Sequence, residues 1–230
     1  MTSSVRSKKS KTSDLPLTGA SNGASRMAAL KHFKRVDPHF HKATRDHHSS
    51  LPAYLSEKRT RSELFASLLS IVISQQLGNA AADTIFARVK KACGGRLTPE
   101  SIAKTRLVAF RGAGLSGAKT KTLKAIAVAI KNNSLNLLLL KKLPEADAAE
   151  KLMSIRGLGP WSVEMFLMNT LGRSDVFSPG DLGLIRAMET IYRLPRNAPR
   201  SALFAIAEKW SPFRTYASLL LWRTRDTKAG

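Results

Sequence analysis

The chain has 230 residues, of which 43% are hydrophobic and 23% charged, a composition typical of a globular protein with one sizeable core or two small lobes. Lysine and arginine total 38 against 16 aspartates and glutamates, and the net charge of +22 indicates a polyanionic partner whose binding weakens as salt rises. With no basic amphipathic anchor, nucleic acid is favoured over a membrane, and the single cysteine, Cys93, excludes an internal disulfide and a four-cysteine iron–sulfur cluster.

The N-terminal part of the chain is basic and rich in histidine. Residues 1–25 contain many Ser, Thr, Lys and Gly residues and few large apolar ones, which predicts a disordered basic tail. Its KKSK cluster fits a nuclear-localisation signal or non-specific attraction to DNA, and both interpretations stay open. From residue 26 to residue 55 we expect a short helix, a break at Pro38 and a second short helix. All histidines lie between His32 and His48, where solvated surface positions are favoured over a zinc site because no cysteine accompanies them.

The middle of the chain predicts a series of helices with recognisable start signals. Thr60 and Glu63 form a capping-box pattern ahead of an apolar helix that ends in the segment Ser74–Gly78. Further helix starts are expected at Asn79, Pro99, Ser116, Pro144, Pro199 and Pro212. Since there is no period-two run of β-branched residues and no internal repeat, the predicted fold class is all-α.

The segment from Lys151 to Met188 combines a glycine-proline hairpin with a later aspartate. Gly157 can adopt a positive φ where one helix stops, and Pro160 suits the first turn of the next helix. The turn between them, which includes Gly159, leaves backbone N–H groups at a helix N-terminus, an arrangement that binds phosphate. A second apolar helix then leads to Asp181, which stands where a third helix is expected to begin.

Two motifs in this segment resemble a known family. RGLGPW, followed downstream by DVFSPGDLG, resembles the signature of the helix-hairpin-helix DNA glycosylases, in particular their 3-methyladenine glycosylase II branch. The resemblance covers roughly residues 61–222. It implies a two-lobed fold, with an outer helical lobe made of residues 26–60 and 183–230 and a hairpin-containing lobe made of residues 61–182. Asp181 would line the cleft between the lobes.

Asp181 matches the catalytic aspartate of the family. Breaking the bond between a purine and its sugar develops positive charge on the deoxyribose, and a fixed carboxylate stabilises that charge. Asp181 could also orient or deprotonate the attacking water, or serve simply as a helix N-cap. Asp175 is the nearest rival, and we expect it to be structural. Family members that also cut the DNA strand carry a lysine where this chain has Trp161, so the resemblance implies that water is the nucleophile and that the lyase step is missing.

The resemblance also implies a base pocket and a wedge. Trp161, Met165 and Trp222 match the pocket, where stacking would hold a purine swung out of the duplex, although the two tryptophans could also be plain core. Met165 stands where some relatives have a tyrosine, which predicts a pocket with less hydrogen bonding. Gln76, with Leu77 beside it, matches the side chain that the family inserts into the duplex. The alternative for this segment is a polar helix C-cap.

Contacts to the DNA backbone are expected from two places. One is the hairpin, through Gly157, Gly159 and Ser162, and the other is the helix start at Ser116, with Lys119 and Lys121. Arg186 and Arg214 could assist, although each could equally be a solvated charge. In the family the hairpin carbonyls often hold a structural monovalent cation. No other metal or cofactor is expected.

The expected function is therefore monofunctional hydrolysis of the N-glycosidic bond of alkylated purines of the 3-methyladenine type, the first step of base excision repair. Two alternatives stay open: a DNA-binding protein without catalysis, and a glycosylase for other lesions such as ethenoadenine or deaminated purines. The expected partners are double-stranded damaged DNA and a downstream abasic-site endonuclease. We expect a monomer with no membrane association, in the nucleus of a eukaryotic cell or otherwise in the cytoplasm or nucleoid.

Overall fold

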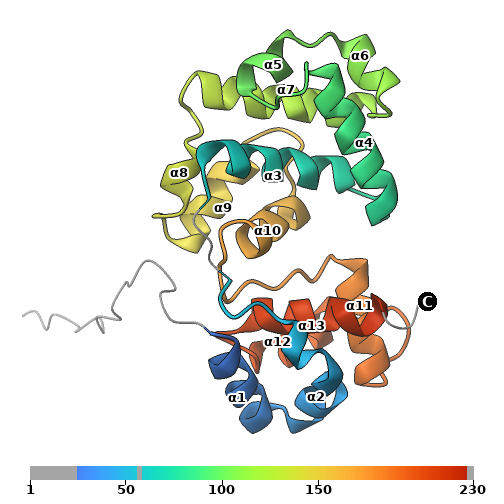
Figure 1. Ribbon diagram of the computed structural model, residues 1–230. Coiled ribbons are helices and arrows are strands. Elements are labelled where there is room, and N and C mark those ends of the chain that lie inside the picture. The colour runs from blue at the N-terminus through green and yellow to red at the C-terminus, as the bar shows by residue number, and fades with distance from the viewer. Residues whose placement is uncertain (1–24, 56–58, 227–230) are drawn as a thin grey trace, which may run out of the picture.

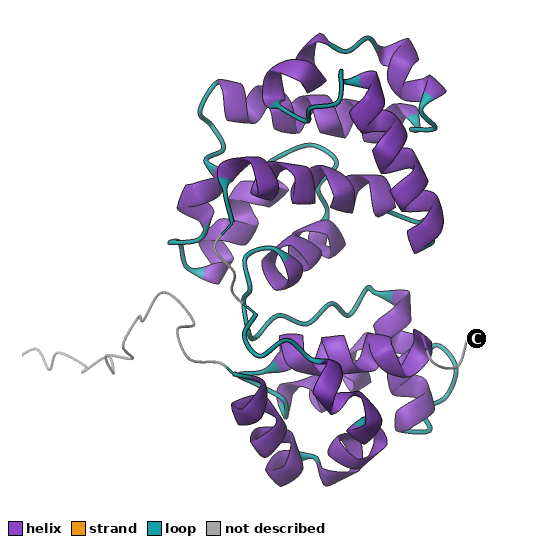
Figure 2. Cartoon of the chain, in the orientation of Figure 1, coloured by secondary structure: helices purple, strands orange, loops and turns teal. Residues whose placement is uncertain are grey.

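The computed structural model describes residues 25–55 and 59–226, and this part of the chain is helical and contains no strand (Figure 2). The tail predicted for residues 1–25 lies outside the described residues except for Ser25. No described helix combines the length and apolar character needed to cross a membrane. The helices, in chain order, are α1 Arg26–Val36, α2 Pro38–Ala43, η1 Arg45–Ser50, α3 Arg61–Ser74, α4 Asn79–Ala92, α5 Pro99–Lys104, α6 Leu107–Gly112, α7 Gly117–Lys131, α8 Leu137–Leu140, α9 Glu145–Met153, α10 Pro160–Asn169, α11 Leu182–Ile191, α12 Arg200–Glu208 and α13 Arg214–Asp226.

Most of the predicted helix starts are confirmed. Thr60 and Glu63 form the capping box of α3, Pro99 occupies the first turn of α5, and the Ser116 hydroxyl accepts a hydrogen bond from the Lys119 N–H at the start of α7. Gly78, rather than Asn79, is the N-cap of α4. The last helix begins at Arg214, after Pro212. The short helices α6 and α8 were not predicted, because segments of four to six residues depend on packing more than on local sequence.

The buried apolar side chains form two clusters, which correspond to two halves of the molecule in Figure 1. We call α3–α10 the hairpin lobe; its cluster runs from Leu64 to Val176. We call α1, α2, η1 and α11–α13 the outer lobe; its cluster joins residues 29–51 to residues 177–221. Trp222 packs against both clusters and so lies where the lobes meet.

A buried carboxylate ties the two ends of the chain together in the outer lobe. Asp37, which is 6% exposed, accepts hydrogen bonds from the Tyr192 hydroxyl at 2.6 Å and from the Trp210 indole N–H at 3.3 Å. It also caps α2 by accepting a hydrogen bond from the Phe40 N–H at 3.0 Å. The Phe40 and Trp210 rings lie 4.7 Å apart between centroids. This network fixes the N-terminal helices against the C-terminal ones.

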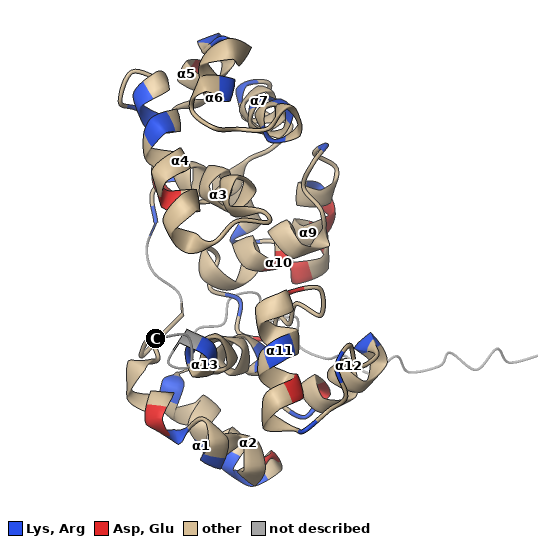
Figure 3. Ribbon diagram, turned by 90° about the vertical axis from the view of Figure 1, so that its right-hand side faces the viewer, with Lys and Arg blue, Asp and Glu red and all other residues tan. Residues whose placement is uncertain are grey.

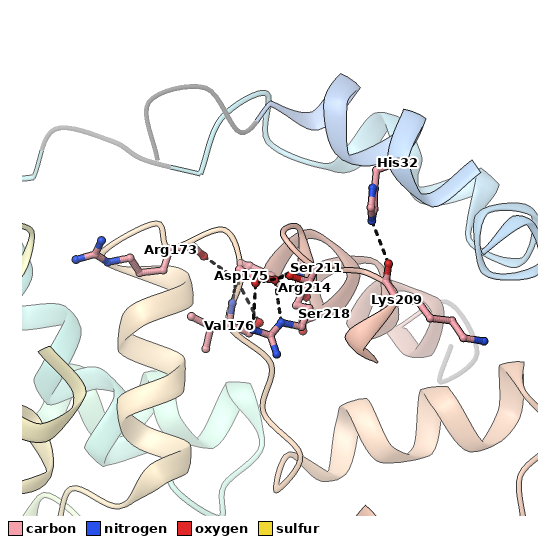
Figure 4. A network of polar contacts seen from close by, with 9 residues as sticks. His32, Arg173, Asp175, Val176, Lys209, Ser211, Arg214 and Ser218 are labelled. Atoms are coloured by element: carbon pink, nitrogen blue, oxygen red, sulfur yellow. Dashed lines mark hydrogen bonds and ion pairs between the residues drawn. The ribbon is translucent and has the colours of Figure 1, made fainter. Parts of the chain in front are cut away.

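The connection from α10 to α11 is held by polar contacts of Arg173 and of Asp175, and Figure 4 shows those of Asp175. The Arg173 guanidinium donates to backbone carbonyls at the end of α8 and just after it, including that of Leu140 at 3.2 Å. Asp175 forms an ion pair with Arg214 at 2.8 Å and accepts a hydrogen bond from the Ser211 hydroxyl. The Asp175 carboxylate thus holds the start of α13 against the segment that leads to Asp181, a structural contact.

Candidate active site

Asp181 lies between two tryptophans at the start of α11. Its Oδ1 accepts hydrogen bonds from the Leu184 N–H and from the Trp222 indole N–H, both at 2.9 Å. Its Oδ2 accepts a hydrogen bond from the Trp161 indole N–H, also at 2.9 Å. Asp181 is therefore an N-cap, one of the roles that the sequence left open, and its carboxylate also accepts hydrogen bonds from the two aromatic residues of the predicted pocket.

Three separate elements build this arrangement. Trp161 comes from the first turn of α10, Asp181 from the start of α11, and Trp222 from α13 in the outer lobe. Gly183 makes the close approach of Trp222 feasible, because a Cβ at residue 183 would lie 3.1 Å from the indole Cδ1 and 2.9 Å from Asp181 Oδ1. Sequence reasoning missed Gly183. A glycine inside the first turn of an apolar helix is the signal that could have found it.

The third predicted pocket residue has a different environment. Met165 lies one turn after Trp161 and is 6% exposed within the apolar cluster of the hairpin lobe. Trp161 and Trp222 are only partly buried, so their indoles keep exposed surface as well as core contacts. The structure therefore brings the two indoles together at Asp181, whereas Met165 is one of the side chains that α10 buries in the hairpin lobe.

A second carboxyl, which the sequence did not single out, lies near Asp181. Glu164 on α10 accepts a hydrogen bond from the Ser178 hydroxyl, which fixes the loop before Asp181. Burial raises the pKa of the Glu164 carboxyl, and the negative charge of Asp181 acts in the same direction, although the Ser178 hydrogen bond and Arg200 oppose them. The site therefore holds two carboxyl groups whose environments differ.

The predicted wedge residues occupy an exposed turn after α3. Gln76 has a φ of +58°, a left-handed conformation that is uncommon for a residue with a side chain, and Leu77 is 38% exposed. Gln75 joins this turn to the hairpin, because its side-chain amide donates to the Ser162 hydroxyl at 2.7 Å and to the Gly157 carbonyl at 3.3 Å. The turn and the hairpin therefore form one connected surface.

Several side chains expected to bind DNA make contacts inside the protein. The Lys119 ammonium donates to the carbonyls of Ile73 at 2.8 Å and Gln75 at 2.6 Å, so it supports the end of α3, and burial lowers its pKa. Ser162 is 2% exposed. Ser116 caps α7 through its hydroxyl.

Both arginines that were considered as helpers are paired with acids. Arg186 bonds Glu189 at 2.7 Å, and Arg214 bonds Asp175. Their positive charges are therefore balanced within the protein.

The two hairpin glycines differ in what surrounds them. Gly157 has a φ of +93°, and a Cβ there would lie 1.9 Å from the Thr122 hydroxyl oxygen on α7. Gly159 is the N-cap of α10 with a φ of −95°, and a Cβ there would have no neighbour within 4 Å. Packing within the protein requires glycine at residue 157, whereas residue 159 leaves the backbone at the start of α10 open to an approaching group.

Known proteins share this architecture. The sequence profile described as HhH-GPD superfamily base excision DNA repair protein matches residues 69–212. A DNA-3-methyladenine glycosylase of Schizosaccharomyces pombe is 34% identical over 71% of this chain and 73% of its own length. One of Saccharomyces cerevisiae is 32% identical over 86% of this chain and 79% of its own length. The solved structure of a 3-methyladenine DNA glycosylase of Schizosaccharomyces pombe in complex with abasic DNA superimposes with a TM-score of 0.75 at 29% identity, covering 86% of this chain and 97% of that chain.

Proposed function

This chain belongs to the HhH-GPD superfamily of base excision DNA repair proteins, and from that premise we propose that it is a DNA glycosylase. The reaction is hydrolysis of the N-glycosidic bond of alkylated purines, of the 3-methyladenine type, in duplex DNA. The relatives named DNA-3-methyladenine glycosylase support this substrate class. The observation that carries the proposal is the Asp181 carboxylate held by the indoles of Trp161 and Trp222.

Asp181 stabilises the positive charge that develops on the sugar as the base departs. The bond from C1′ to the purine nitrogen breaks, its electron pair leaves with the base, and water adds to C1′ and releases a proton. A preorganised group of this kind lowers a barrier by roughly 3 to 4 kcal/mol. A carboxylate offers about four acceptor positions, and three N–H groups occupy three of them here. One position, on Oδ2, stays available for the attacking water.

The two indoles form the wall against which the flipped base stacks. A purine alkylated on a ring nitrogen is cationic, so an aromatic face adds a cation–π attraction of roughly 0.5 to 2 kcal/mol. Trp161 and Trp222 are already oriented by their hydrogen bonds to Asp181. Because Met165 offers no hydrogen-bond donor behind them, selection rests on the charge and shape of the lesion more than on hydrogen bonding.

Gln76 and Leu77 fill the space that the flipped nucleotide leaves, and the hairpin binds the strand through its backbone N–H groups. The positive φ of Gln76 and the exposure of Leu77 support this role. The monovalent cation at the hairpin stays a prediction. Two carbonyls there already accept hydrogen bonds, that of Ile155 from the Leu158 N–H and that of Gly157 from Gln75.

The enzyme is monofunctional and acts as a monomer. Trp161 occupies the position of the nucleophilic lysine found in the lyases of the family, so no Schiff base forms and the strand is left intact. The product is an abasic site, which an abasic-site endonuclease must process. Because its substrate is DNA, the protein works in the nucleus of a eukaryotic cell, or otherwise in the cytoplasm or nucleoid.

The test is base release from defined duplexes. Wild-type protein is incubated with methylated DNA and with a duplex containing one ethenoadenine, and strand breaks are counted with and without hot alkali. We expect alkali-dependent breaks in methylated DNA, reduced at least 100-fold by Asp181→Asn. The control is Asp147→Asn, which changes an exposed aspartate on α9.

Three outcomes would contradict parts of this proposal. Breaks without alkali would refute the monofunctional assignment, and undiminished release by Asp181→Asn would remove Asp181 from the mechanism. Tight duplex binding with no release from methylated, ethenoadenine-containing or deaminated DNA would instead support a protein that only binds DNA.

A further inference from the structure

A hollow of about 510 Å³ lies beside the hairpin, between α6, the start of α7 and residues 156–157. Arg111 of α6, Lys121 of α7 and Arg156 of the hairpin all line it, and no acidic side chain does. We call this hollow the basic pocket. It lies within the hairpin lobe, where Figure 3 shows Lys and Arg on α4, α6 and α7.

The three cations of the basic pocket have no ion-pair or hydrogen-bond partner for their side chains among the described residues. They differ in this from Arg173, whose guanidinium is bound by carbonyls, and from Arg214, which is paired with Asp175. All three are exposed. Three positive groups around one hollow repel one another, and an anion that enters the hollow relieves this repulsion.

The start of α7 contributes polar groups to the same hollow. The helix has 15 residues, and the N–H groups in its first turn lack partners within the helix. Gly117 has no side chain to cover them, and a Cβ at that residue would have no neighbour within 4 Å. Thr120 also lines the basic pocket; it is 2% exposed, and its hydroxyl has no hydrogen-bond partner in the described structure. Buried hydroxyls normally have a partner, so the Thr120 hydroxyl at the edge of the hollow has hydrogen-bonding capacity that the protein leaves unused.

We propose that the basic pocket binds a phosphate of the DNA backbone, next to the phosphate bound by the hairpin N–H groups. This inference rests on the proposed function. Of the two lysines at the start of α7, Lys121 is the one that contacts DNA, because the ammonium of Lys119 donates to the carbonyls at the end of α3. Arg111 and Arg156 supply guanidinium groups, whose geometry suits phosphate oxygens.

Salt dependence of DNA binding tests the basic pocket. Each phosphate contact adds about 0.9 to the slope of log K against log salt concentration. We therefore expect Lys121→Ala to make the slope shallower by about 1, with equal loss of affinity for damaged and undamaged duplex. The double variant Arg111→Ala/Arg156→Ala should weaken binding in the same uniform way. The matched control is Lys131→Ala, at the other end of α7, which should leave slope and affinity unchanged.

The outcomes separate this inference from the proposed function. An unchanged slope in both pocket variants, with thermal unfolding like that of wild type, would overturn the basic pocket as a DNA site. Calorimetric binding of inorganic phosphate that the variants abolish, without any change in DNA affinity, would also overturn it and identify a site for free phosphate. If wild-type protein released no base, this would count against the proposed function. The salt dependence of DNA binding would still decide whether the basic pocket binds the DNA backbone.

Discussion

Replacing the two hairpin glycines one at a time should separate folding from DNA binding. At Gly157 an added Cβ would lie 1.9 Å from the hydroxyl oxygen of Thr122 and 2.9 Å from its Cβ and Cγ2, and φ is +93°. At Gly159 an added Cβ would have no neighbour within 4 Å, and φ is −95°. Gly157→Ala should therefore disturb the packing of the hairpin on α7, whereas Gly159→Ser should not.

The expected magnitude for Gly157→Ala has two parts. A residue with a side chain at positive φ loses about 1 to 2 kcal/mol of stability, and overpacking against α7 adds about 1 to 3 kcal/mol. The unfolding free energy should therefore fall by about 2 to 5 kcal/mol, which for a protein of this size lowers the melting temperature by roughly 4 to 20 °C. In the Thr122→Ala background, where the hydroxyl and Cγ2 are absent, the steric part should shrink and the backbone part should remain.

Urea unfolding followed by tryptophan fluorescence measures these changes, and titration of an abasic duplex measures binding. Gly159→Ser should keep the stability of the wild type, since serine is a good N-cap, but should bind DNA more weakly because its side chain lies where the phosphate approaches. An unchanged urea midpoint for Gly157→Ala, or an equal loss in both Thr122 backgrounds, would refute the steric argument. Wild-type affinity in Gly159→Ser would refute the backbone approach.

Three further changes have expected outcomes. Asp37→Ala should reduce the unfolding free energy in urea by about 3 kcal/mol, because it leaves the buried indole N–H of Trp210 and the partly buried hydroxyl of Tyr192 unpaired. A loss below about 1 kcal/mol would contradict this. Glu164→Gln should be more stable than wild type at pH 7 and equal to it near pH 4. Burial raises the pKa of Glu164 in the folded protein above 4.5, so the protonated carboxyl favours folding most below pH 4.5. This contribution to stability is lost as pH rises through the folded pKa. Parallel pH profiles of unfolding would contradict it. Lys119→Met should lower the unfolding free energy in urea by about 1 to 3 kcal/mol, because the carbonyls at the end of α3 lose their charged donor. It should also slow base flipping, measured with 2-aminopurine, since the turn that carries Gln76 and Leu77 follows α3. An unchanged flipping rate would show that the ammonium does not position this turn.

Local features of the fold were accessible from the residues alone. The capping box of Thr60 and Glu63 and the capping position of Asp181 depend on contacts between residues three positions apart, and the proline at the start of α10 depends only on its own fixed φ and missing N–H. Such contacts are encoded in short stretches of sequence, so the helix starts could be predicted. The two motifs around Gly157 and Asp181 also indicated the family, which the profile match bears out.

The sequence contained the local signals but not the directions in which long side chains turn. It indicated Asp181 and both tryptophans, but their hydrogen bonds join residues 20 and 41 positions apart, on different helices. It suggested Lys119 as a DNA contact, whereas folding places the ammonium on carbonyls 44 and 46 residues away. The basic pocket likewise brings together α6, α7 and the hairpin. Local sequence specifies where helices begin because those contacts are short-range, while side chains meet across the chain only after the apolar faces of many helices have packed.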